Sequence, residues 1–251
     1  MANELRYGMV GGSLSAFIGE VHRKAIAFDP GTKLVCGCFS NVPAENEETA
    51  SAYAVAPERT YSDYKQMAQA EAAREDGIDF VTICTPNVLH YEIAKEFLLA
   101  GINVVCEKPL CFEVDQAMEL EALAKERNLL FAVTYTYPGY TMSCVVRDMI
   151  AQGKIGKIDA VNAEYVQDWL INELEPQEGV EENLSVWRKD PKFSGVSNCV
   201  GDIGTHIECF VHYVTGLKIK RLAATTNKCG HALALNANIL VEYENGANGA
   251  Y

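Results

Sequence analysis

The chain has 251 residues, of which 49% are hydrophobic, so it can form one large domain or two modest ones with a real hydrophobic core. Its 34 acidic residues outnumber its 21 basic residues and give a formal net charge of −13, which argues against nucleic acid and anionic membrane surfaces as partners. The N-terminus lacks a basic region and a long apolar segment, and no later window of about 18 residues is uninterruptedly apolar, so we expect a cytoplasmic protein without a secretion signal or membrane span.

The nine cysteines are scattered along the chain, and none of them forms a CxxC pair. Several lie inside apolar segments. We therefore expect buried, reduced thiols rather than a disulfide framework or a metal site.

The first half of the chain alternates between short apolar runs and segments with helical periodicity. The expected strands cover residues 5–10, 33–39, 80–84, 102–106 and 129–134, and the expected helices cover 17–28, 61–75, 113–127 and a segment that ends at Ala100 before Gly101. Strands separated by helices of this length indicate a parallel sheet with right-handed crossovers. We therefore predict an α/β domain over residues 1–134.

The second half has a different pattern, rich in tyrosine. Helices are expected at 142–152 and 201–215, strands at 158–167, 221–226 and 238–243, and an irregular acidic loop at 172–182. These elements predict an α+β domain over residues 135–251 with a mainly antiparallel open sheet. Asn245-Gly246 predicts a turn into one more hairpin strand, and because the sequence then stops at Tyr251 we expect this domain to be incomplete, either as a short natural chain or as a fragment.

Lys108 follows directly after one of the expected strands. The run from Ile102 to Cys106 is apolar on both faces, which is typical of strands in the middle of a parallel sheet, and Glu107, Lys108 and Pro109 stand where it ends. Ligands bind at this edge of open α/β sheets. Lys108 is therefore either a charge at the rim or a working group.

A glycine-rich turn, GMVGGSLSAFIGEVH from Gly8 to His22, joins the first strand to the first helix. Glycines allow a backbone to approach a pyrophosphate closely, and the start of a helix offers free amide groups. The run is not a clean GxGxxG, since Ser13 and Ser15 stand where more glycine is expected and Gly19 comes late. An ordinary tight turn is the alternative, but the position after the first strand favours dinucleotide binding.

The end of the second strand is where the choice between NAD and NADP is usually made. An acidic side chain there binds the ribose hydroxyls, whereas an arginine favours a 2′-phosphate. Ser40 and Asn41 occupy this place and give neither sign. The lack of a nearby arginine favours NAD, with NADP left open.

Another strand ends in CTPNVLH, from Cys84 to His90. Pro86 and Asn87 predict a turn, and helix capping alone explains Asn87. His90 falls in the first helical turn, where it is either a partly exposed surface histidine or part of the lining of a cofactor cleft.

The segment GDIGTHIECFVHYVTG begins at Gly201 and places Asp202 and His206 four residues apart, as neighbours on one face of a helix. A carboxylate beside an imidazole orients it and favours its protonated form, which suits a histidine that accepts a proton. The alternative is an aspartate at the start of a helix with an incidental histidine.

Together these motifs resemble those of the Gfo/Idh/MocA oxidoreductases, which include glucose–fructose oxidoreductase and inositol dehydrogenases. The resemblance covers essentially the whole chain. It rests on the glycine turn with Gly19-x-x-His22, on Thr85-Pro86-Asn87-x-x-His90, on Glu107-Lys108-Pro109 and on Gly201-Asp202-x-Gly204-x-His206, which occur in this order at family-like separations. The run WRKDPKFSG from Trp187 to Gly195 is also similar to a segment of some members.

The resemblance implies a Rossmann-type N-terminal domain and an NAD(P)-dependent dehydrogenase that acts on a sugar, an inositol or a related polyol. Lys108 would contact the reacting oxygen, His206 would exchange its proton, and Asp202 would help to position the substrate. The implied cofactor contacts are Gly11, Gly12, Ser13, Phe17, Ile18, Ser40, Thr85, Pro86, Asn87, His90 and Glu107, and the substrate candidates are Tyr135, Tyr165, Trp187 and Arg188. Family members often form homo-oligomers through the sheet of the second domain.

Two other functions stay open at this point. A catalytically inactive nucleotide-binding regulator, or a remnant of such an enzyme, would account for the altered glycine turn and for a second domain that lacks roughly another hundred residues. A methyltransferase also uses a glycine turn after its first strand, but that function leaves the Glu107-Lys108-Pro109 triplet unexplained.

Overall fold

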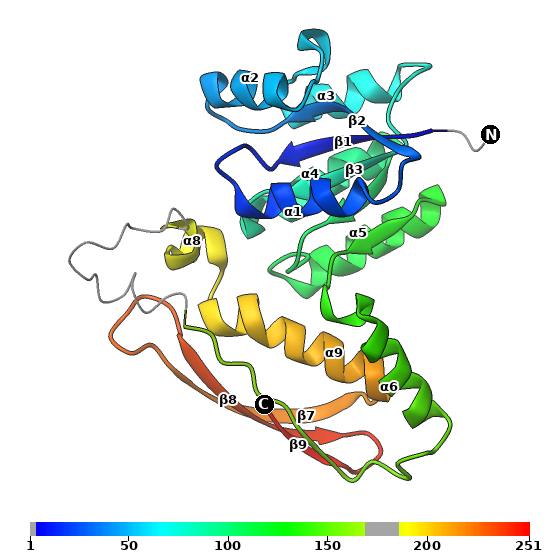
Figure 1. Cartoon of the computed structure of the whole chain (residues 1–251). Helices are drawn as coiled ribbons and strands as arrows, with labels where there is room; N and C mark the ends of the chain where they lie inside the picture. The colour runs from blue at the N-terminus through cyan, green and yellow to red at the C-terminus, as the bar shows by residue number, and fades with distance from the viewer. Residues whose placement is uncertain (1–3, 169–185) are drawn as a thin grey trace. The chain divides into compact units, whose positions relative to one another are not determined.

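The computed structural model describes residues 4–168 and 186–251, so the acidic loop expected at 172–182 lies outside the described residues. The chain divides into two compact units, Met1–Thr134 and Tyr135–Tyr251. Figure 1 shows the first unit from blue to green and the second from green to red. No helix in the two described ranges is long and apolar enough to cross a membrane.

The first unit is a five-stranded parallel sheet with the strand order β2-β1-β3-β4-β5, which confirms the predicted α/β domain. Its strands are β1 (Leu5–Gly11), β2 (Thr32–Cys38), β3 (Phe80–Cys84), β4 (Asn103–Cys106) and β5 (Phe131–Val133). Its main helices are α1 (Phe17–Ile26), α2 (Pro43–Ala52), α3 (Tyr64–Ala72), α4 (His90–Leu99) and α5 (Val114–Arg127). The strand order reverses at β1 and β3, and the carboxyl ends of these strands form the switch point where such sheets bind ligands.

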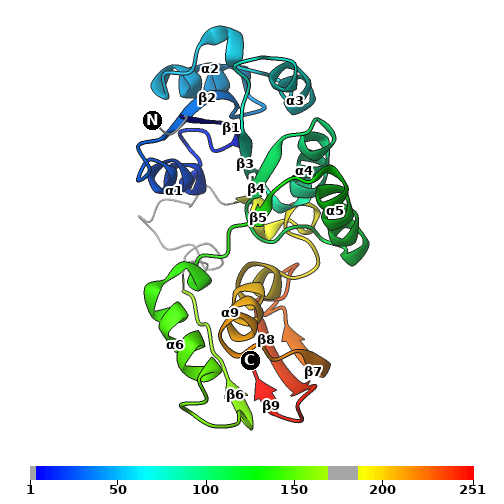
Figure 2. The same ribbon diagram turned by 90° about the vertical axis from the view of Figure 1, so that its right-hand side faces the viewer.

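Helices cover both faces of this sheet (Figure 2). On one face, Ile18 of α1 and Ala50 of α2 pack with Tyr7 and Met9 of β1. On the other face, α3, α4 and α5 pack on a larger core that contains Met67, Phe97 and Leu120. Burial on both faces explains why the strands of this unit read as continuous apolar runs.

The helix α2 was not expected, because its sequence PAENEETASA is too acidic to display an apolar stripe. Pro43 stands in its first turn, where proline favours helix formation. The positions that face the sheet are filled by Asn46, Thr49 and Ala50, all buried. Because two of these buried residues are polar, the sequence shows no helical period of apolar residues here.

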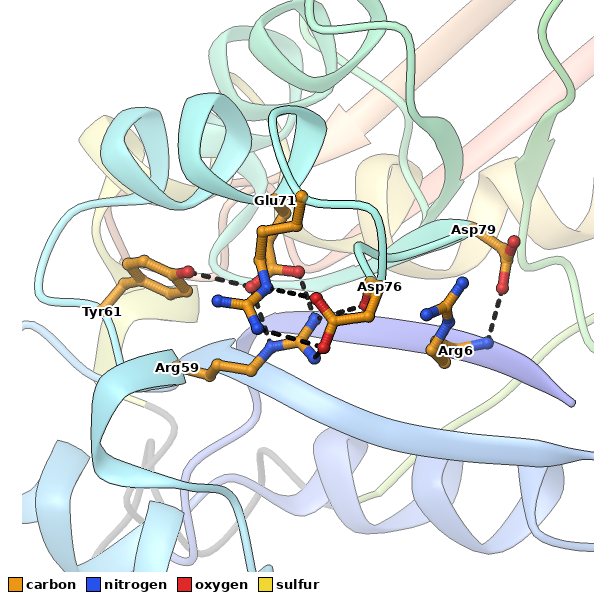
Figure 3. Close-up of polar contacts among 7 residues, drawn as sticks. Arg6, Arg59, Tyr61, Glu71, Asp76 and Asp79 are labelled. Carbon is orange, nitrogen blue, oxygen red and sulfur yellow. Dashed lines mark hydrogen bonds and ion pairs between the residues drawn. The ribbon is translucent and has the colours of Figure 1, made fainter.

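A buried ion pair fastens the short helix η1 (Pro57–Arg59) to α3 (Figure 3). The Arg59 guanidinium donates to both carboxylate oxygens of Glu71, and the Tyr61 hydroxyl donates to Glu71 Oε1 at 2.9 Å. The Glu71 side chain is fully buried, whereas Asp76, which also contacts Arg59, is 58% exposed. Burial and the charge of Glu71 raise the pKa of the neighbouring Cys36 thiol. This cluster packs inside the first unit, where it stabilises the fold by joining η1 to α3.

The second unit contains a four-stranded, mainly antiparallel sheet with the order β6-β9-β8-β7, as predicted. Its strands are β6 (Ala160–Asn162), β7 (Ile219–Asn227), β8 (Asn236–Tyr243) and β9 (Asn248–Ala250), and its longer helices are α6 (Thr141–Ala151) and α9 (Thr205–Thr215). Strand β9 is the hairpin arm expected after Asn245-Gly246. Strand β6 is much shorter than the expected 158–167, because among the described residues it pairs only with the three-residue β9, in parallel.

The helix α9 covers one face of this sheet, where Val211 packs with Val241, Tyr243 and Ala247. On β8, buried and exposed residues alternate, as expected for a strand with one covered face. The side chain of Leu240 is 67% exposed. The sheet therefore has an open side that carries apolar residues.

The thiols are less buried than the sequence suggested. Cys36, Cys84 and Cys106 are buried in strands of the first unit, but Cys229 is exposed and the other five cysteines are intermediate. All nine are free thiols.

Candidate active site

The glycine turn between β1 and α1 has the geometry of a dinucleotide-binding loop. Gly11 and Gly12 have φ angles of 76° and 73°, a region that favours glycine, and a Cβ on Gly11 would lie 2.8 Å from the Cys84 carbonyl oxygen. A Cβ on Gly19 would lie 2.3 Å from the Cα of Gly12, so Gly19 provides the close packing of helix on turn that the third glycine of the fingerprint provides. The glycine that comes late in the sequence thus makes a close helix-to-turn contact in the fold.

The start of α1 can accept a pyrophosphate. Its N-cap residue, Ala16, makes no side-chain capping bond, so the first helical amide groups are not satisfied by a cap. Ser13 is buried, Phe17 is 78% exposed at the first position of the helix, and Ile18 packs into the core. The turn therefore suits a nicotinamide dinucleotide through its backbone amide groups more than through its side chains.

Behind this turn lies a buried polar network centred on Glu107. Its Oε1 atom is 2.9 Å from Nε2 of His22 and accepts a hydrogen bond from the Thr134 hydroxyl at 2.7 Å. His22 Nδ1 lies 3.1 Å from the Thr82 hydroxyl. The second carboxylate oxygen of Glu107 accepts from the backbone amide of Lys108 at 3.1 Å. The network thus fixes the backbone from which the Lys108 side chain extends.

His22 and Glu107 form an ion pair inside the first unit. Burial lowers the pKa of His22, but interactions with Cys84 and with the Glu107 carboxylate outweigh it and raise the pKa to about 10. Burial raises the pKa of Glu107, but hydrogen bonds with His22 and Thr134 outweigh it and the net pKa is lowered. Both groups are therefore charged at neutral pH.

The charge of His22 should make stability depend on pH. The folded-state pKa of about 10 lies above the ordinary value of 6.5, so the stabilisation is complete below about pH 6.5 and is lost as the pH rises through 10. We expect wild type to exceed His22→Gln in free energy of unfolding by on the order of 2 kcal/mol near pH 6.5, and this difference to shrink towards pH 10. Urea unfolding from pH 6 to 10 measures it.

The exposed His212 provides the control for this experiment. His212→Gln removes an exposed imidazole from the second unit and shows how much of the difference comes from losing a histidine side chain as such. A difference for His22→Gln that stays constant or grows between pH 6.5 and 10 would contradict a charged His22.

His90 is fully buried, so the expectation of a partly exposed surface histidine was wrong. Its Nδ1 lies 2.7 Å from the Pro109 carbonyl oxygen and its Nε2 lies 2.9 Å from the Thr85 carbonyl oxygen. Burial lowers its pKa. The ring joins the two loops that follow β3 and β4.

The loop after β3 presents Thr85, Pro86 and Asn87. Pro86 is the N-cap of the short helix η2 (Asn87–Leu89) and makes no side-chain capping bond, so Asn87 is not the cap that the sequence suggested. The buried Thr85 hydroxyl makes no hydrogen bond within the described part of the chain. A polar atom of this kind, at the carboxyl edge of the sheet, fits a role in holding a polar ligand.

In the second unit, His206 is buried among aromatic rings. The ring centroids of Tyr137, Tyr135 and Tyr165 lie 5.0, 5.8 and 6.5 Å from that of His206. The hydroxyls of Tyr137 and Tyr165 form a short hydrogen bond, and the Tyr135 hydroxyl lies 2.6 Å from that of Thr205. Burial and the bond to Tyr165 raise the pKa of Tyr137. Tyr135 and Tyr165 were expected near the site, whereas Tyr137 was missed in the run YTYPGY.

Asp202 precedes α9 in the π-helical turn η5 (Val200–Gly204), where a continuous α-helix from Gly201 had been expected. A π turn is wider than an α turn, so the four-residue spacing between Asp202 and His206 does not follow α-helical geometry. Single π turns of this kind are frequent at functional sites. The local backbone therefore supports a special role for this segment.

The segment WRKDPKFSG forms two short helices, η4 (Val186–Lys189) and α8 (Pro191–Ser194). The Arg188 guanidinium lies over the Trp187 ring, 4.4 Å from the centroid. Two hydrogen bonds hold their backbone, from Asn198 to the Arg188 carbonyl at 2.8 Å and from Ser194 to the Trp187 carbonyl at 3.0 Å. Both side chains thus belong to an ordered part of the second unit.

Comparisons with known proteins agree with this arrangement. Residues 5–135 match the model of the oxidoreductase family with the NAD-binding Rossmann fold, and residues 145–251 match the GFO/IDH/MocA C-terminal domain. These matches confirm the expected NAD-binding domain and the order of the two domain types.

Similar solved structures include an inositol dehydrogenase homologue from Azotobacter vinelandii in complex with NAD⁺, with 37% identity and a TM-score of 0.92 over 100% of this chain. The same homologue in complex with NADH and myo-inositol gives a TM-score of 0.89 at 36% identity. Among curated proteins, the uncharacterized oxidoreductase YfiI of Bacillus subtilis is 36% identical over 99% of this chain. A levoglucosan dehydrogenase of Pseudarthrobacter phenanthrenivorans is 30% identical over 84%.

The relatives are longer than this sequence. The chain spans 64% of the Azotobacter homologue and of YfiI, and 51% of the levoglucosan dehydrogenase. The two family models nevertheless match nearly all of its residues, in the order in which the two folds occur along the chain. The chain belongs to the GFO/IDH/MocA family of oxidoreductases.

Proposed function

We propose that this protein is an NAD-dependent dehydrogenase that oxidises a ring hydroxyl of a cyclic polyol or sugar to a ketone and catalyses the reverse reduction. The nicotinamide, when bound, takes up or returns the hydride. The choice of a cyclic polyol is supported by the 36% identity to the Azotobacter homologue, whose structure contains myo-inositol, and by the 30% identity to a levoglucosan dehydrogenase.

The three proposed catalytic side chains supply complementary chemistry. Oxidation of an alcohol removes a proton from oxygen while hydride leaves carbon, so the site needs a base and a cation that stabilises the developing alkoxide. Lys108 is the proposed cation and His206 the proposed base, with Asp202 positioning the substrate. We propose that Lys108, from the first unit, and His206, from the second, act on the same hydroxyl.

The surroundings of His206 suit this role. The three tyrosine rings leave the imidazole buried, which keeps bulk water away from the proposed base. The tyrosine hydroxyls, together with Trp187 and Arg188, are the proposed contacts for substrate hydroxyl groups.

The observation that carries the proposal is the support built beneath Lys108. Its backbone amide is bonded to a carboxylate that is itself held by His22 and Thr134, all at the carboxyl end of β4. A rim charge placed for solubility needs no buried ion pair under it. A group that must meet one substrate oxygen does, because small displacements cost rate.

The test is turnover by the purified chain. We expect NAD-dependent formation of NADH with at least one compound from a panel of inositols, levoglucosan and free sugars, followed by absorbance of the reduced nicotinamide. Binding of NADH without turnover of any compound in the panel, or of the corresponding ketones with NADH, would favour the alternative of an inactive nucleotide-binding protein.

Homo-oligomerisation through the open side of the second sheet is part of the same proposal. The exposed Leu240 on β8 supports it, because apolar side chains on an uncovered sheet face commonly mark an interface.

A further inference from the structure

A carboxylate that the sequence motifs do not include joins the two ends of the expected cofactor site. Glu45, in the first turn of α2, accepts a hydrogen bond from the Ser15 hydroxyl on Oε1 and one from the Ser40 hydroxyl on Oε2, each at 2.5 Å. The Ser13 hydroxyl lies 3.1 Å from that of Ser15. Glu45 therefore contacts both the glycine turn and the segment that follows β2.

These two segments have separate tasks in dinucleotide-binding sheets. The glycine turn holds the pyrophosphate, and the end of β2 holds the adenosine ribose, so the ribose lies between them. A carboxylate usually comes from the end of β2 itself, but Ser40 and Asn41 stand there in this chain. Glu45 brings a carboxylate to the same place from the neighbouring helix.

Glu45 is charged at neutral pH. Hydrogen bonds from the Ser15 and Ser40 hydroxyls lower its pKa, and the side chain is only partly buried. Within residues 4–168 and 186–251 no lysine or arginine forms an ion pair with it. Arg23 of α1 stacks on the Tyr53 ring, 3.6 Å from the centroid. Glu45 thus places a negative charge beside the glycine turn, and no lysine or arginine of the described residues pairs with it.

We propose that Glu45 determines the preference for NAD over NADP. Its carboxylate accepts hydrogen bonds from the 2′- and 3′-hydroxyls of the adenosine ribose, and its charge repels a 2′-phosphate. The inference rests on the proposed function only for the cofactor and not for the substrate or the catalytic residues.

The chemistry of the group allows both effects. A carboxylate has about four acceptor positions, and the two serine hydroxyls occupy two of them, so two are left for a ribose diol. A 2′-phosphate carries about −1.5 to −2 charges at neutral pH and offers no donor to a carboxylate, so it meets like-charge repulsion there. If Glu45 only joined the glycine turn to α2, it would neither favour the ribose diol of NAD nor disfavour the 2′-phosphate of NADP.

The experiment compares the dissociation constants of NADH and NADPH by fluorescence titration for wild type, Glu45→Gln and Glu47→Gln. We expect wild type to bind NADH at least about tenfold more tightly than NADPH. Glu45→Gln should bind NADPH about tenfold more tightly than wild type does and NADH several-fold more weakly, because the repulsion and one acceptor are lost. Glu47→Gln removes the same charge from an exposed position two residues along α2 and should keep the wild-type ratio within about twofold.

Equal changes in both dissociation constants for Glu45→Gln, or an unchanged ratio, would overturn the inference and leave Glu45 as a structural clamp. Wild type provides a second measurement if the variant does not fold. Its preference for NADH should weaken as ionic strength rises, since screening reduces repulsion of the 2′-phosphate, and a preference that grows with salt would also overturn the inference.

This outcome is separate from that of the proposed function. A chain that prefers NADH through Glu45 but turns over no polyol keeps the inference and loses the dehydrogenase proposal. A chain that oxidises polyols but uses NAD and NADP equally keeps the dehydrogenase proposal and loses the inference about Glu45.

Discussion

Replacing Lys108 by alanine is expected to lower kcat for polyol oxidation by about 10²- to 10³-fold, which corresponds to about 3–4 kcal/mol in the barrier. In the proposed mechanism the ammonium group stabilises negative charge that develops on the substrate oxygen only as the proton leaves, so its loss should fall on kcat more than on binding. The dissociation constant of NADH should change little, because the glycine turn, not Lys108, is the proposed binding site of the pyrophosphate. Steady-state kinetics with a saturating cofactor measure the effect.

Lys125→Ala is the matched control for this substitution. Lys125 is 72% exposed on α5 and pairs with Glu121 on the same helix. The Lys125→Ala substitution removes the same side chain and charge as Lys108→Ala from the same unit. We expect its kcat to stay within about twofold of wild type. Unchanged kcat in Lys108→Ala would remove Lys108 from the mechanism and return it to the role of a rim charge.

Replacing Glu71 by alanine is expected to lower the free energy of unfolding by about 3–5 kcal/mol. The substitution leaves the Arg59 guanidinium, which is 9% exposed, without its main partner, and it leaves the Tyr61 hydroxyl without its acceptor. An unpaired buried charge is among the most costly defects in a folded protein. Urea unfolding monitored by circular dichroism gives the value.

Asp76→Ala removes the more exposed of the two carboxylates that contact Arg59, and we expect it to cost less than about 1 kcal/mol. Arg59→Met combined with Glu71→Leu should recover most of the loss, since an apolar pair removes both charges together. A Glu71→Ala cost as small as that of Asp76→Ala would show that water reaches this ion pair.

The fold was largely predictable because its signals are local. Continuous apolar strands such as Phe80–Cys84, each followed by a helical period, determine a parallel sheet on physical grounds. The Asn245-Gly246 turn likewise predicted strand β9. The altered glycine turn was harder to interpret, since only the contact between Gly19 and Gly12 in three dimensions shows what the late glycine does.

Features that depend on tertiary contacts were not predictable. The helix α2 was hidden because polar residues fill its buried face. The contacts of Glu45, on which its proposed role depends, were hidden because Ser15 and Ser40 come from other segments. The burial of His90 depends on two loop carbonyls that the sequence does not place. Tyr137 was missed because the spacing of the tyrosines in its segment does not show which ring lies beside His206.

The central claim is that Lys108 and His206 act on the same substrate oxygen. A double-mutant cycle for kcat with wild type, Lys108→Ala, His206→Ala and the double variant tests it most directly. If both groups act in one step, each single variant is slow and the double variant is slower than the worse single variant by less than about tenfold, as in other catalytic groups that work as a unit. Losses that multiply, as they do for independent sites, would contradict the claim.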